Sequence, residues 1–513
     1  MDAHVVADQS AVFALLADPA AHGGVSVTRI DTHGAAVFLA GDAAYKVKRA
    51  VAFPFMDFST LEKRRAACER ELEVNRANAP GIYLSVVPIT RAADGLALGG
   101  AGEPVDYAVK MRRFDERQTL DNLPPEALTP DLLAALAKAV STSHERAPVM
   151  GSDAVARLAL TAAQNDADFI ASPELFAPEA AQALSHATAR ILGGVVPLLR
   201  ERAAQGFVRR CHGDLHLRNI VLLAGTPVLF DAIEFNDDIA ICDVLYDLAF
   251  LLMDLWERGH ADAANTVLNR YLWDGPAEHY AGLAALPLFL SLRAAIRAKV
   301  SAAGLAHLPP EKQDAARAEV LDYFALAQAF LAPSAPALLA IGGLSGTGKS
   351  TLAAALASHL GRAPGAVVLR SDIERKHLAG VGETERLSAA AYTFEATQAV
   401  YARMRARADL ALAAGHSVIA DAVHARADER DAIAALAGQA GAHFLGLWLE
   451  APVGLLVARV EQRRGDASDA DAKIVRQQAD YDLGPLTWER IDVSHGAQAQ
   501  GIEALRTAGL LSR

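Results

Sequence analysis

The spacing of apolar and polar residues divides the first part of the chain into a sheet region and helical regions. Residues 25–49 alternate between apolar and polar positions, with His-Gly and Gly-Asp turn signals between the runs, which predicts three short antiparallel strands. Residues 130–205 and 245–331 show mostly helical patterns, and Thr129 before Pro130 is a typical helix start. A small sheet followed by helices is therefore expected.

A boundary follows the last of these helices. The stretch A-P-S-A-P-A at 332–337 separates a helix that ends near Leu331 from a new apolar strand. Beyond the boundary, apolar strands alternate with helices, which predicts a parallel sheet covered by helices. The predicted strands are 338–341, 366–369, 417–420 and 444–449.

Composition narrows the class of protein. A chain of 513 residues with 52% hydrophobic and 21% charged residues is typical of a compact protein of several domain-sized parts. A net charge of −12 argues against a surface that coats nucleic acid, and neither a signal peptide nor a membrane span is expected. The three cysteines (Cys68, Cys211 and Cys242) lack metal-type spacing, which indicates reduced thiols in a cytoplasmic protein.

Residues 342–350 read G-G-L-S-G-T-G-K-S and contain a complete G-x-x-x-x-G-K-[ST] motif between a predicted strand and a predicted helix. Glycines let the backbone curl around phosphates, and the helix N-terminus attracts anions. Lys349 is expected to reach the β- and γ-phosphates of ATP, and the Ser350 hydroxyl is expected to bind Mg²⁺. The predicted nucleotide-binding residues here are Gly343, Ser345, Gly346, Thr347, Gly348, Lys349, Ser350 and Thr351.

Charged residues follow the later strands of this half. Asp372 and Arg375 come just after strand 366–369, and Asp421 ends the next strand, at the edge where open α/β sheets bind ligands. One aspartate could accept a proton from an attacking hydroxyl while the other holds Mg²⁺. Arg459 and Arg463 are four residues apart on one helix face and could close over the transferred phosphoryl group.

Residues 337–513 resemble the small P-loop kinases typified by polynucleotide kinase, gluconate kinase and zeta-toxin-like proteins. The motifs that carry the resemblance are G-G-L-S-G-T-G-K-S, R-S-D-I-E-R-K, V-I-A-D-A-V-H-A-R and R-V-E-Q-R-R-G-D-A-S-D-A. The resemblance implies an acceptor hydroxyl near Asp372, so Asp421 is interpreted as the metal ligand. Arg375 and His424 are the candidate acceptor-binding residues. Lys376 and Arg430 could line the same pocket, although each of them, like His424, is expected at the surface when taken alone.

A second motif lies at residues 211–235, C-H-G-D-L-H-L-R-N-I-V-L-L-A-G-T-P-V-L-F-D-A-I-E-F. Its two apolar runs flank Ala-Gly-Thr, which predicts a hairpin with a three-residue loop and with Leu223 opposite Pro227. That pairing places Asn219 opposite Asp231 at the open end. An amide oxygen and a carboxylate together form a site suited to Mg²⁺.

The approach to this hairpin has the spacing H-x-D-x-x-x-x-N, as His212, Asp214 and Asn219. Protein-kinase-like enzymes use such an Asp to accept the acceptor proton, and the Asn with a later Asp to hold metal. Asp214 is therefore the predicted catalytic residue. His212 is expected to brace the loop and His216 to be a polar loop side chain.

Residues 25–330 resemble aminoglycoside phosphotransferases and other kinase-like small-molecule kinases through C-H-G-D-L-H-L-R-N, V-L-F-D-A-I-E-F and C-D-V-L-Y-D-L-A-F. The resemblance implies that Asp243 and Asp247 brace the catalytic loop and that a strand lysine contacts the ATP phosphates. Lys46 and Lys48 lie on the same side of their strand, so alternation does not choose between them. The resemblance favours Lys46.

The lysine needs a glutamate partner on the following helix, for which a capping box from Ser59 to Glu62 predicts the start. Glu69 and Glu71 flank the apolar stripe of that helix almost symmetrically. The pattern E-L-x-x-N resembles the helix of the family and favours Glu71.

Together these features predict a two-part kinase that uses ATP and Mg²⁺. A kinase-like domain is expected over residues 1–332, with a small lobe at about 25–115 and a helical lobe at about 125–331, and a P-loop kinase domain over 337–513. Two kinase-type sites acting on hydroxyls of sugars, aminoglycosides or nucleosides are the leading hypothesis. A nucleic-acid 5′-hydroxyl kinase and a nucleotide-sensing regulatory protein are the alternatives. The acceptor and the oligomeric state are left open.

Overall fold

The computed structural model describes residues 4–512 except residues 54, 94 and 152. The contacts within the chain define two compact units. Unit 1 comprises Met1–Arg157 and Glu201–Leu251, and unit 2 comprises Leu158–Arg200 and Leu252–Arg513. Unit 2 therefore contains long helices that precede the P-loop region in the chain, as well as that region itself.

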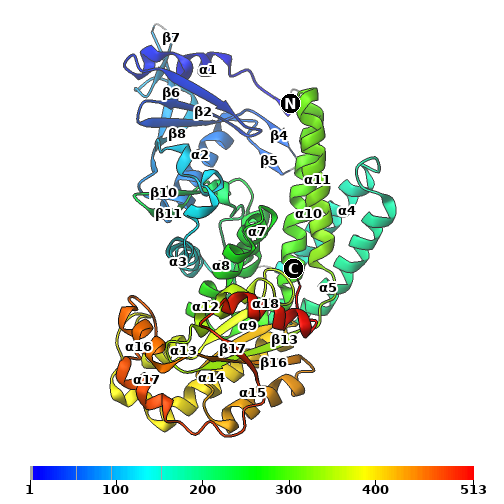
Figure 1. Cartoon of the computed structure of the whole chain (residues 1–513). Coiled ribbons are helices and arrows are strands. Elements are labelled where there is room, and N and C mark those ends of the chain that lie inside the picture. The colour runs from blue at the N-terminus through cyan, green and yellow to red at the C-terminus, as the bar shows by residue number, and fades with distance from the viewer. Residues whose placement is uncertain (1–3, 54, 94, 152, 513) are drawn as a thin grey trace. The chain divides into compact units, whose positions relative to one another are not determined.

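Unit 1 is built on a six-stranded antiparallel sheet with the order β1-β2-β3-β8-β6-β7 (Figure 1). Its strands are β1 (Val27–Asp31), β2 (Ala35–Ala40), β3 (Ala43–Lys48), β6 (Tyr83–Ala92), β7 (Gly95–Leu98) and β8 (Pro104–Arg112). Val12 and Leu16 of α1 (Ser10–Ala17) pack with Tyr45 and Val47 on one face. On the opposite face, Cys68 of α2 (Leu61–Arg76) joins a second apolar cluster. Because side chains alternate along β3, its two lysines face α2.

The three strands predicted within residues 25–49 are present as β1–β3, whereas β6–β8 were not predicted. The other strands and α-helices that lie wholly or mostly in unit 1 are short strands, a hairpin and helices. They are β4 (Ala52–Phe53), β5 (Met56–Asp57), α3 (Pro130–Arg146), β9 (Val208–Arg210), β10 (Ile220–Leu223), β11 (Thr226–Leu229), α6 (Asp237–Ala240), β12 (Ile241–Asp243) and α7 (Val244–Glu257). Thr129 caps α3 as predicted, accepting a hydrogen bond from the Leu132 N–H.

Two local predictions were wrong by one residue. The β10–β11 register pairs Leu223 with Thr226, so the loop has two residues, Ala and Gly, with φ angles of 49° and 79°. Two-residue loops with positive φ match the twist of paired strands, which explains the shorter turn. Asn219 consequently faces Phe230, whose N–H donates to the Asn219 carbonyl (3.0 Å). Likewise Thr60, not Ser59, caps α2.

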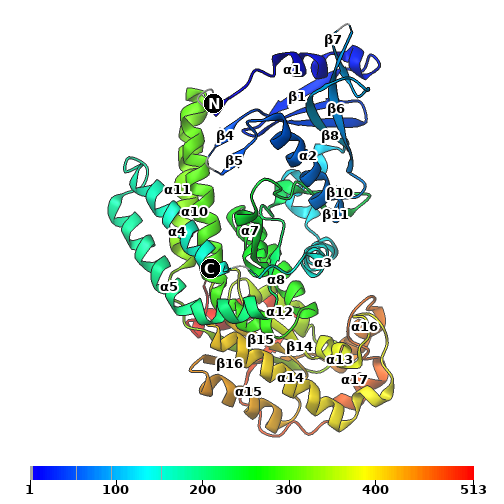
Figure 2. The same cartoon turned by 180° about the vertical axis from the view of Figure 1, so that it is seen from behind.

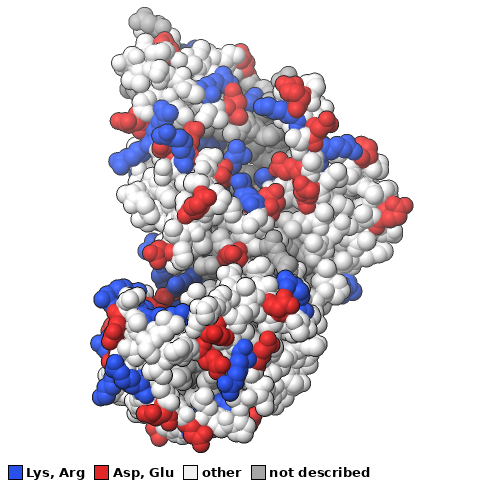
Figure 3. Space-filling model, in the orientation of Figure 1, with Lys and Arg blue, Asp and Glu red and all other residues white. Residues whose placement is uncertain are grey.

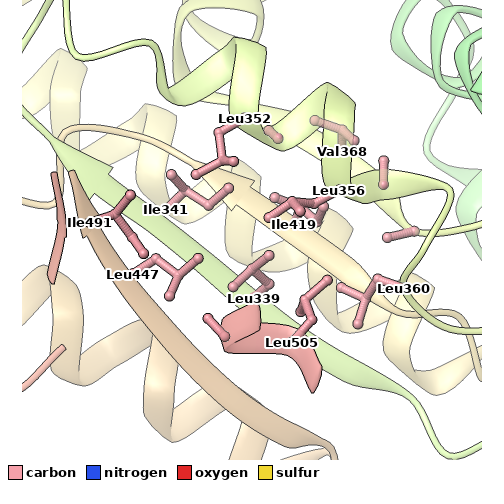
Figure 4. Packing of buried hydrophobic residues seen from close by; sticks show 14 of the residues in the cluster. Leu339, Ile341, Leu352, Leu356, Leu360, Val368, Ile419, Leu447, Ile491 and Leu505 are labelled. Carbon is pink, nitrogen blue, oxygen red and sulfur yellow. The ribbon is translucent and has the colours of Figure 1, made fainter. Parts of the chain in front are cut away.

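Unit 2 contains the predicted parallel sheet, with the order β14-β15-β13-β16-β17. The strands are β13 (Ala337–Gly343), β14 (Val367–Arg370), β15 (Val418–Asp421), β16 (His443–Glu450) and β17 (Glu489–Asp492); only β17 was not predicted. Helices α12 (Lys349–Ala357) and α18 (Ala497–Thr507) pack on one face of this sheet. Helices α14 (Phe394–Ala413) and α15 (Ala427–Gln439) pack on the other (Figures 1 and 2). A hydrophobic core that includes Leu339, Leu356 and Leu505 lies between the sheet and the helices α12 and α18 (Figure 4).

The remaining α-helices that lie wholly or mostly in unit 2 either precede the sheet in the chain or follow one of its strands. They are α4 (Ala154–Ile170), α5 (Pro178–Ala204), α8 (Ala261–Asp274), α9 (Glu278–Gly282), α10 (Leu286–Gly304), α11 (Pro310–Phe330), α13 (Ser371–Ala379), α16 (Val453–Gln462) and α17 (Ala472–Ala479). The helical stretch Glu278–Gly304 is long and apolar enough to cross a membrane. However, 78% of its apolar window is buried inside the protein, as in a core helix.

Helix α8 covers the open edge of the parallel sheet with side chains. Asn269 Oδ1 accepts a hydrogen bond from the Val368 N–H (2.6 Å), and the Trp273 indole N–H donates to the Val368 carbonyl (2.8 Å). Asn265 and Asn269 both donate to the Ala366 carbonyl. Side chains of a preceding helix thus satisfy edge-strand groups that would otherwise be open for pairing with another chain.

Replacing Asn269 by Leu is expected to loosen this edge. The Val368 N–H would lose its acceptor, and a buried unsatisfied backbone group costs about 1–3 kcal/mol. Amide exchange of β14, followed by mass spectrometry, should accelerate accordingly. Thr266→Ala, an exposed change on the same helix, is the matched control. Unchanged protection of β14 in Asn269→Leu would show that α8 does not stabilise the edge.

Candidate functional site

Two lysines and three acidic residues form a charge cluster in unit 1. Lys46 Nζ lies 2.8 Å from Glu71 Oε1 and 2.6 Å from Asp231 Oδ1. Lys48 Nζ lies 2.5 Å from Glu71 Oε2 and is also paired with Glu234. The fully buried Glu71 therefore bridges both lysines, and Lys46 is the one that extends to Asp231.

The charges in this cluster depend on one another. Burial alone would raise the pKa of Glu71, but the neighbouring lysines hold it below its ordinary value. Burial would lower the pKa of Lys46, yet Asp231 and Glu71 hold it well above its ordinary value. Glu69, the other candidate partner, is exposed and pairs with Arg65 at 2.9 Å. The strand lysine and Glu71 are thus both charged near neutral pH.

Asp214 lies on the loop between β9 and β10, with 39% of its side chain exposed. Asn219 Nδ2 donates to Asp214 Oδ2 (3.1 Å), which orients the carboxylate. His216 Nε2 is 3.3 Å from the same oxygen, and its ring packs against Phe250. His216 lies on this loop with its polar ring beside Asp214, as predicted, and the structure adds that it is buried.

Asp243 and Asp247, for which the resemblance implied a bracing role, are both buried. Asp247 accepts hydrogen bonds from the backbone N–H groups of His212 (3.2 Å) and Gly213 (2.8 Å). Asp243 makes a bidentate ion pair with Arg202, at 2.7 and 2.8 Å, with both side chains 1% exposed. Asp247 thus braces the loop that carries Asp214, as the resemblance implied, whereas the ion pair of Asp243 is with Arg202 of α5.

Asp231 sits in an uncommon backbone conformation, with φ of 61°. The Tyr83 hydroxyl accepts a hydrogen bond from its N–H (3.0 Å), and His212 Nε2 donates to the preceding Phe230 carbonyl (2.8 Å). These bonds hold the chain after β11 close to Asn219, despite the shifted hairpin register. Amide and carboxylate oxygens at one end of a hairpin fit Mg²⁺ by their donor chemistry.

In unit 2 the phosphate loop joins β13 to α12, and its glycines meet real constraints. A Cβ on Gly343 would lie 2.6 Å from the Leu449 carbonyl oxygen, and one on Gly346 would lie 2.7 Å from that of Leu456. Gly348, at the N-terminus of α12, has φ of 85°. Glycine is therefore required for close approach at two positions and for backbone conformation at the third.

Side chains beside the loop form a second set of candidate groups for binding metal and phosphate. The Ser350 hydroxyl donates to Asp421 Oδ2 (2.5 Å), and Arg370 Nε lies 3.6 Å from the same oxygen. Burial raises the pKa of Asp421, an effect that Arg370 and Lys349 oppose. Burial lowers the pKa of Lys349, whose Nζ donates to the Leu344 carbonyl (3.1 Å). A hydroxyl next to a carboxylate fits a magnesium site.

A cavity of about 1100 Å³ opens in front of the phosphate loop. Most of the residues predicted for this half line it: Ser345, Gly346, Gly348, Lys349, Ser350, Thr351, Asp372, Arg375, Asp421, Arg459 and Arg463. Gly343 and Thr347 do not line it. They shape the loop instead, Thr347 through a hydrogen bond from its hydroxyl to the Leu344 carbonyl (2.8 Å).

The two predicted lid arginines line the cavity, and each also holds backbone. Arg459 Nη2 donates to the Val493 carbonyl (3.0 Å). Arg463 Nη2 donates to the carbonyls of Ser468 (3.0 Å) and Ala470 (2.8 Å), in the connection between α16 and α17. Arg463 therefore orders the connection that follows its own helix, whereas Arg459 holds the chain after β17.

Of the acceptor candidates, the structure retains Arg375 and contradicts His424. Arg375 lines the cavity and donates to the Ala391 carbonyl (2.6 Å). His424 is 1% exposed and lies between the rings of Tyr401 and Trp488, with centroid separations of 5.5 and 5.2 Å. Burial lowers the pKa of His424 to about 3, so it is neutral. Its φ of 49° accompanies this inward position. Lys376 and Arg430 are also buried, not surface residues as expected.

Comparisons with known proteins agree with this two-part geometry. Residues 42–286 match the phosphotransferase enzyme family, and residues 338–482 match an AAA domain. "Uncharacterized protein Rv2004c" of Mycobacterium tuberculosis is 32% identical over 483 residues, covering 90% of this chain and 92% of that protein. The chain belongs to the same family as this mycobacterial protein. An N-terminal kinase-like fold and a C-terminal P-loop kinase fold are thereby confirmed.

Other proteins are similar to one part of the chain only. An adenylyl-sulfate kinase of Myxococcus xanthus is 35% identical over 127 residues, covering 25% of this chain and 64% of that protein. Among solved structures, a choline/ethanolamine kinase family protein from Mesorhizobium loti has 18% identity, a TM-score of 0.40 and coverage of 63% and 94% of the two chains. The APS kinase of Mycobacterium tuberculosis has 19% identity, a TM-score of 0.26 and coverage of 34% and 98%.

Two charged residues of the candidate sites, Glu234 and Arg370, were not predicted from the sequence. Glu234 lies three residues after Asp231, inside a motif that was recognised, yet its pairing with Lys48 depends on how a distant strand packs. Arg370, just before the recognised Asp372, pairs with Asp466 of the α16–α17 connection (3.0 Å). Neither pairing has a local spacing signal.

The family matches support ATP-dependent phosphotransfer for this chain, with ATP and Mg²⁺ as the usual cofactors of such kinases. In each unit, the lysine suits the phosphates of ATP and the oxygen-bearing side chains suit Mg²⁺. The acceptor is a separate question.

Proposed function

We propose that this protein is an ATP-dependent kinase with two sites, each of which transfers a phosphoryl group to a hydroxyl of a small molecule. One observation carries the proposal: each unit holds a lysine, two side chains with hard-oxygen atoms that could bind a metal, and a further carboxylate. Phosphoryl transfer requires little beyond positioning and charge stabilisation, which these three features supply. Sugars, aminoglycosides and nucleosides are the acceptor classes considered.

In unit 1, Lys46 would contact the ATP phosphates while Glu71 fixes its position. Asn219 and Asp231 would hold Mg²⁺, which neutralises charge on the phosphates when bound. Asp214 would accept the proton of the acceptor hydroxyl, since its carboxylate is partly exposed and oriented by Asn219.

In unit 2, Lys349 and the backbone of the phosphate loop would hold the phosphates, and Ser350 with Asp421 would hold Mg²⁺. Asp372 lines the cavity and would accept the acceptor proton. Arg463 would neutralise charge on the transferred group. The similarity to an adenylyl-sulfate kinase supports a small-molecule acceptor for this unit.

Titration calorimetry with a non-hydrolysable ATP analogue and Mg²⁺ tests the proposal. The wild-type chain is expected to bind two analogues. Lys46→Met and Lys349→Ala should each lose one, because removing a desolvated charge partner costs about 2 kcal/mol or more, roughly 30-fold in affinity. ATP consumption with panels of sugars, aminoglycosides and nucleosides then identifies acceptors. A stoichiometry of one, or no acceptor-dependent consumption, would contradict a two-site kinase.

A further inference from the structure

The cavity of unit 2 is larger than one nucleotide site needs. Its volume of about 1100 Å³ exceeds the range of roughly 300–1,000 Å³ typical of single small-molecule pockets. One end is formed by the phosphate loop and Asp421. The other part is lined by α13, the segment 386–392, the start of α14, residues 425–429 and Tyr481. This second part of the cavity, which includes Asp372, is called the acceptor end here.

Exposed aromatic rings gather at the acceptor end. Among the described residues from 337 onward, the aromatic side chains with large exposure are Tyr392 (43%), Phe394 (58%) and Tyr481 (44%). Tyr392 and Tyr481 line the cavity, and Phe394 lies under Arg426, which also lines it. By contrast, Trp448 and Trp488 of the same region are buried. Exposed aromatic surface concentrated at one mouth indicates a ligand with a flat apolar part.

Arginines are stacked on two of these rings. The Arg375 guanidinium lies 4.9 Å from the centroid of the Tyr392 ring, and that of Arg426 lies 5.3 Å from the centroid of Phe394. Arg375 Nε is buried and has no hydrogen-bond partner among the described residues. Arg375 also lines the cavity, and a stacked guanidinium in that position suits a phosphate or sulfate group.

One acidic residue of this wall, Asp469, already has basic and polar partners. Asp469 accepts hydrogen bonds from Lys376 Nζ (2.9 Å), the Tyr392 hydroxyl (2.7 Å) and the Leu387 N–H (2.9 Å). These bonds also fix the Tyr392 ring between the α16–α17 connection and α13. The ring is therefore a preorganised platform.

We propose that the acceptor of the unit 2 site is a mononucleotide-like molecule, whose base stacks on the Tyr392 platform and whose phosphate or sulfate meets Arg375. The inference rests on the proposed kinase function of this site. Asp372 would take the proton of the acceptor hydroxyl as its oxygen forms a bond to the γ-phosphorus and the bond from that phosphorus to the leaving ADP oxygen breaks.

A mononucleotide fits the surroundings better than a nucleic-acid strand. Strand-binding proteins follow the phosphate backbone with a continuous basic groove. On the face drawn in Figure 3, acidic and basic side chains are mixed over the part of unit 2 that carries α16 and α17, and the whole chain has a net charge of −12. The basic groups that matter here lie inside the cavity.

Calorimetry with the full-length chain, saturated with the ATP analogue and Mg²⁺, tests the inference. AMP is the probe, with adenosine, ribose 5-phosphate and gluconate as comparisons that lack the phosphate, the base or both. AMP is expected to bind most tightly. Tyr392→Ala should weaken AMP binding roughly 5- to 150-fold, the range of one stacked base. Tyr392→Phe, which keeps the ring, should retain most of the affinity.

Equal affinity for ribose 5-phosphate, or no effect of Tyr392→Ala beyond that of Tyr392→Phe, would overturn the inference while leaving the kinase proposal intact. Tighter binding of a single-stranded oligonucleotide than of AMP would replace the mononucleotide by a nucleic-acid end. If Lys349→Ala does not alter binding of the ATP analogue itself, the proposed function of the site fails, and the inference falls with it.

Discussion

Replacing Asp214 by Asn is expected to lower phosphoryl transfer at the unit 1 site by roughly 10²- to 10⁴-fold, the usual contribution of a general base. The amide has nearly the same shape but does not accept the hydroxyl proton. Because Asn219 and His216 hold this side chain from its sides, the loop should keep its conformation. Affinity for the ATP analogue should therefore stay unchanged.

The measurement is cleanest in a Lys349→Ala background, where residual ATP consumption reports unit 1 alone. Asp238→Asn, a change of an exposed aspartate on α6 of the same unit, is the matched control. Transfer in Asp214→Asn within a factor of three of its background would remove Asp214 from the chemistry. It would favour a site that binds nucleotide without turnover.

The sequence predicted those parts of the site whose chemistry is local. The phosphate loop needs glycine at fixed steps because neighbouring backbone comes within 2.7 Å of the missing Cβ atoms, so its motif survives without knowledge of the fold. Asp421 was found because a parallel strand places its last residue at the ligand-binding edge. Asp214 and Asn219 were found because only four residues separate them in the chain.

Other parts depend on choices that the local pattern does not fix. Two- and three-residue loops both suit the β10–β11 hairpin, and the twist of the folded strands selects the shorter one. His424 follows a strand end like Asp421, but positive φ turns it under the sheet edge, between two rings. The α8 contacts to β14 join residues about 100 positions apart, which no spacing rule anticipates.

The second strand lysine shows the same limit most clearly. Alternation placed Lys46 and Lys48 on one side of β3, and both in fact reach Glu71. Their surroundings separate them: Lys46 extends to Asp231, whose side chain is 42% exposed, whereas Lys48 is enclosed with Glu234. One lysine therefore reaches a partly exposed carboxylate, as the proposed phosphate contact requires, and the other balances buried charge.

Replacing Lys48 by Met is accordingly expected to destabilise unit 1 by about 3–5 kcal/mol, because it leaves Glu234 as a buried charge without its partner. Amide exchange of β3 and α2 measures the loss. Lys46→Met should cost less stability, since water reaches Asp231, but should abolish nucleotide binding in unit 1. Lys63→Met, at an exposed pair on α2, controls for loss of a surface lysine.

The pH dependence of this loss distinguishes an orphaned carboxylate from lost packing. Burial already raises the pKa of Glu234, and removing Lys48 would raise it further. A carboxyl group whose pKa is higher in the folded than in the unfolded state destabilises the fold at high pH, and the penalty fades as pH falls through the folded pKa. The deficit of Lys48→Met should therefore shrink between pH 8 and pH 5. Adding Glu234→Gln should recover most of it at pH 8, whereas a deficit that is independent of pH and not rescued by Glu234→Gln would assign Lys48 to packing alone.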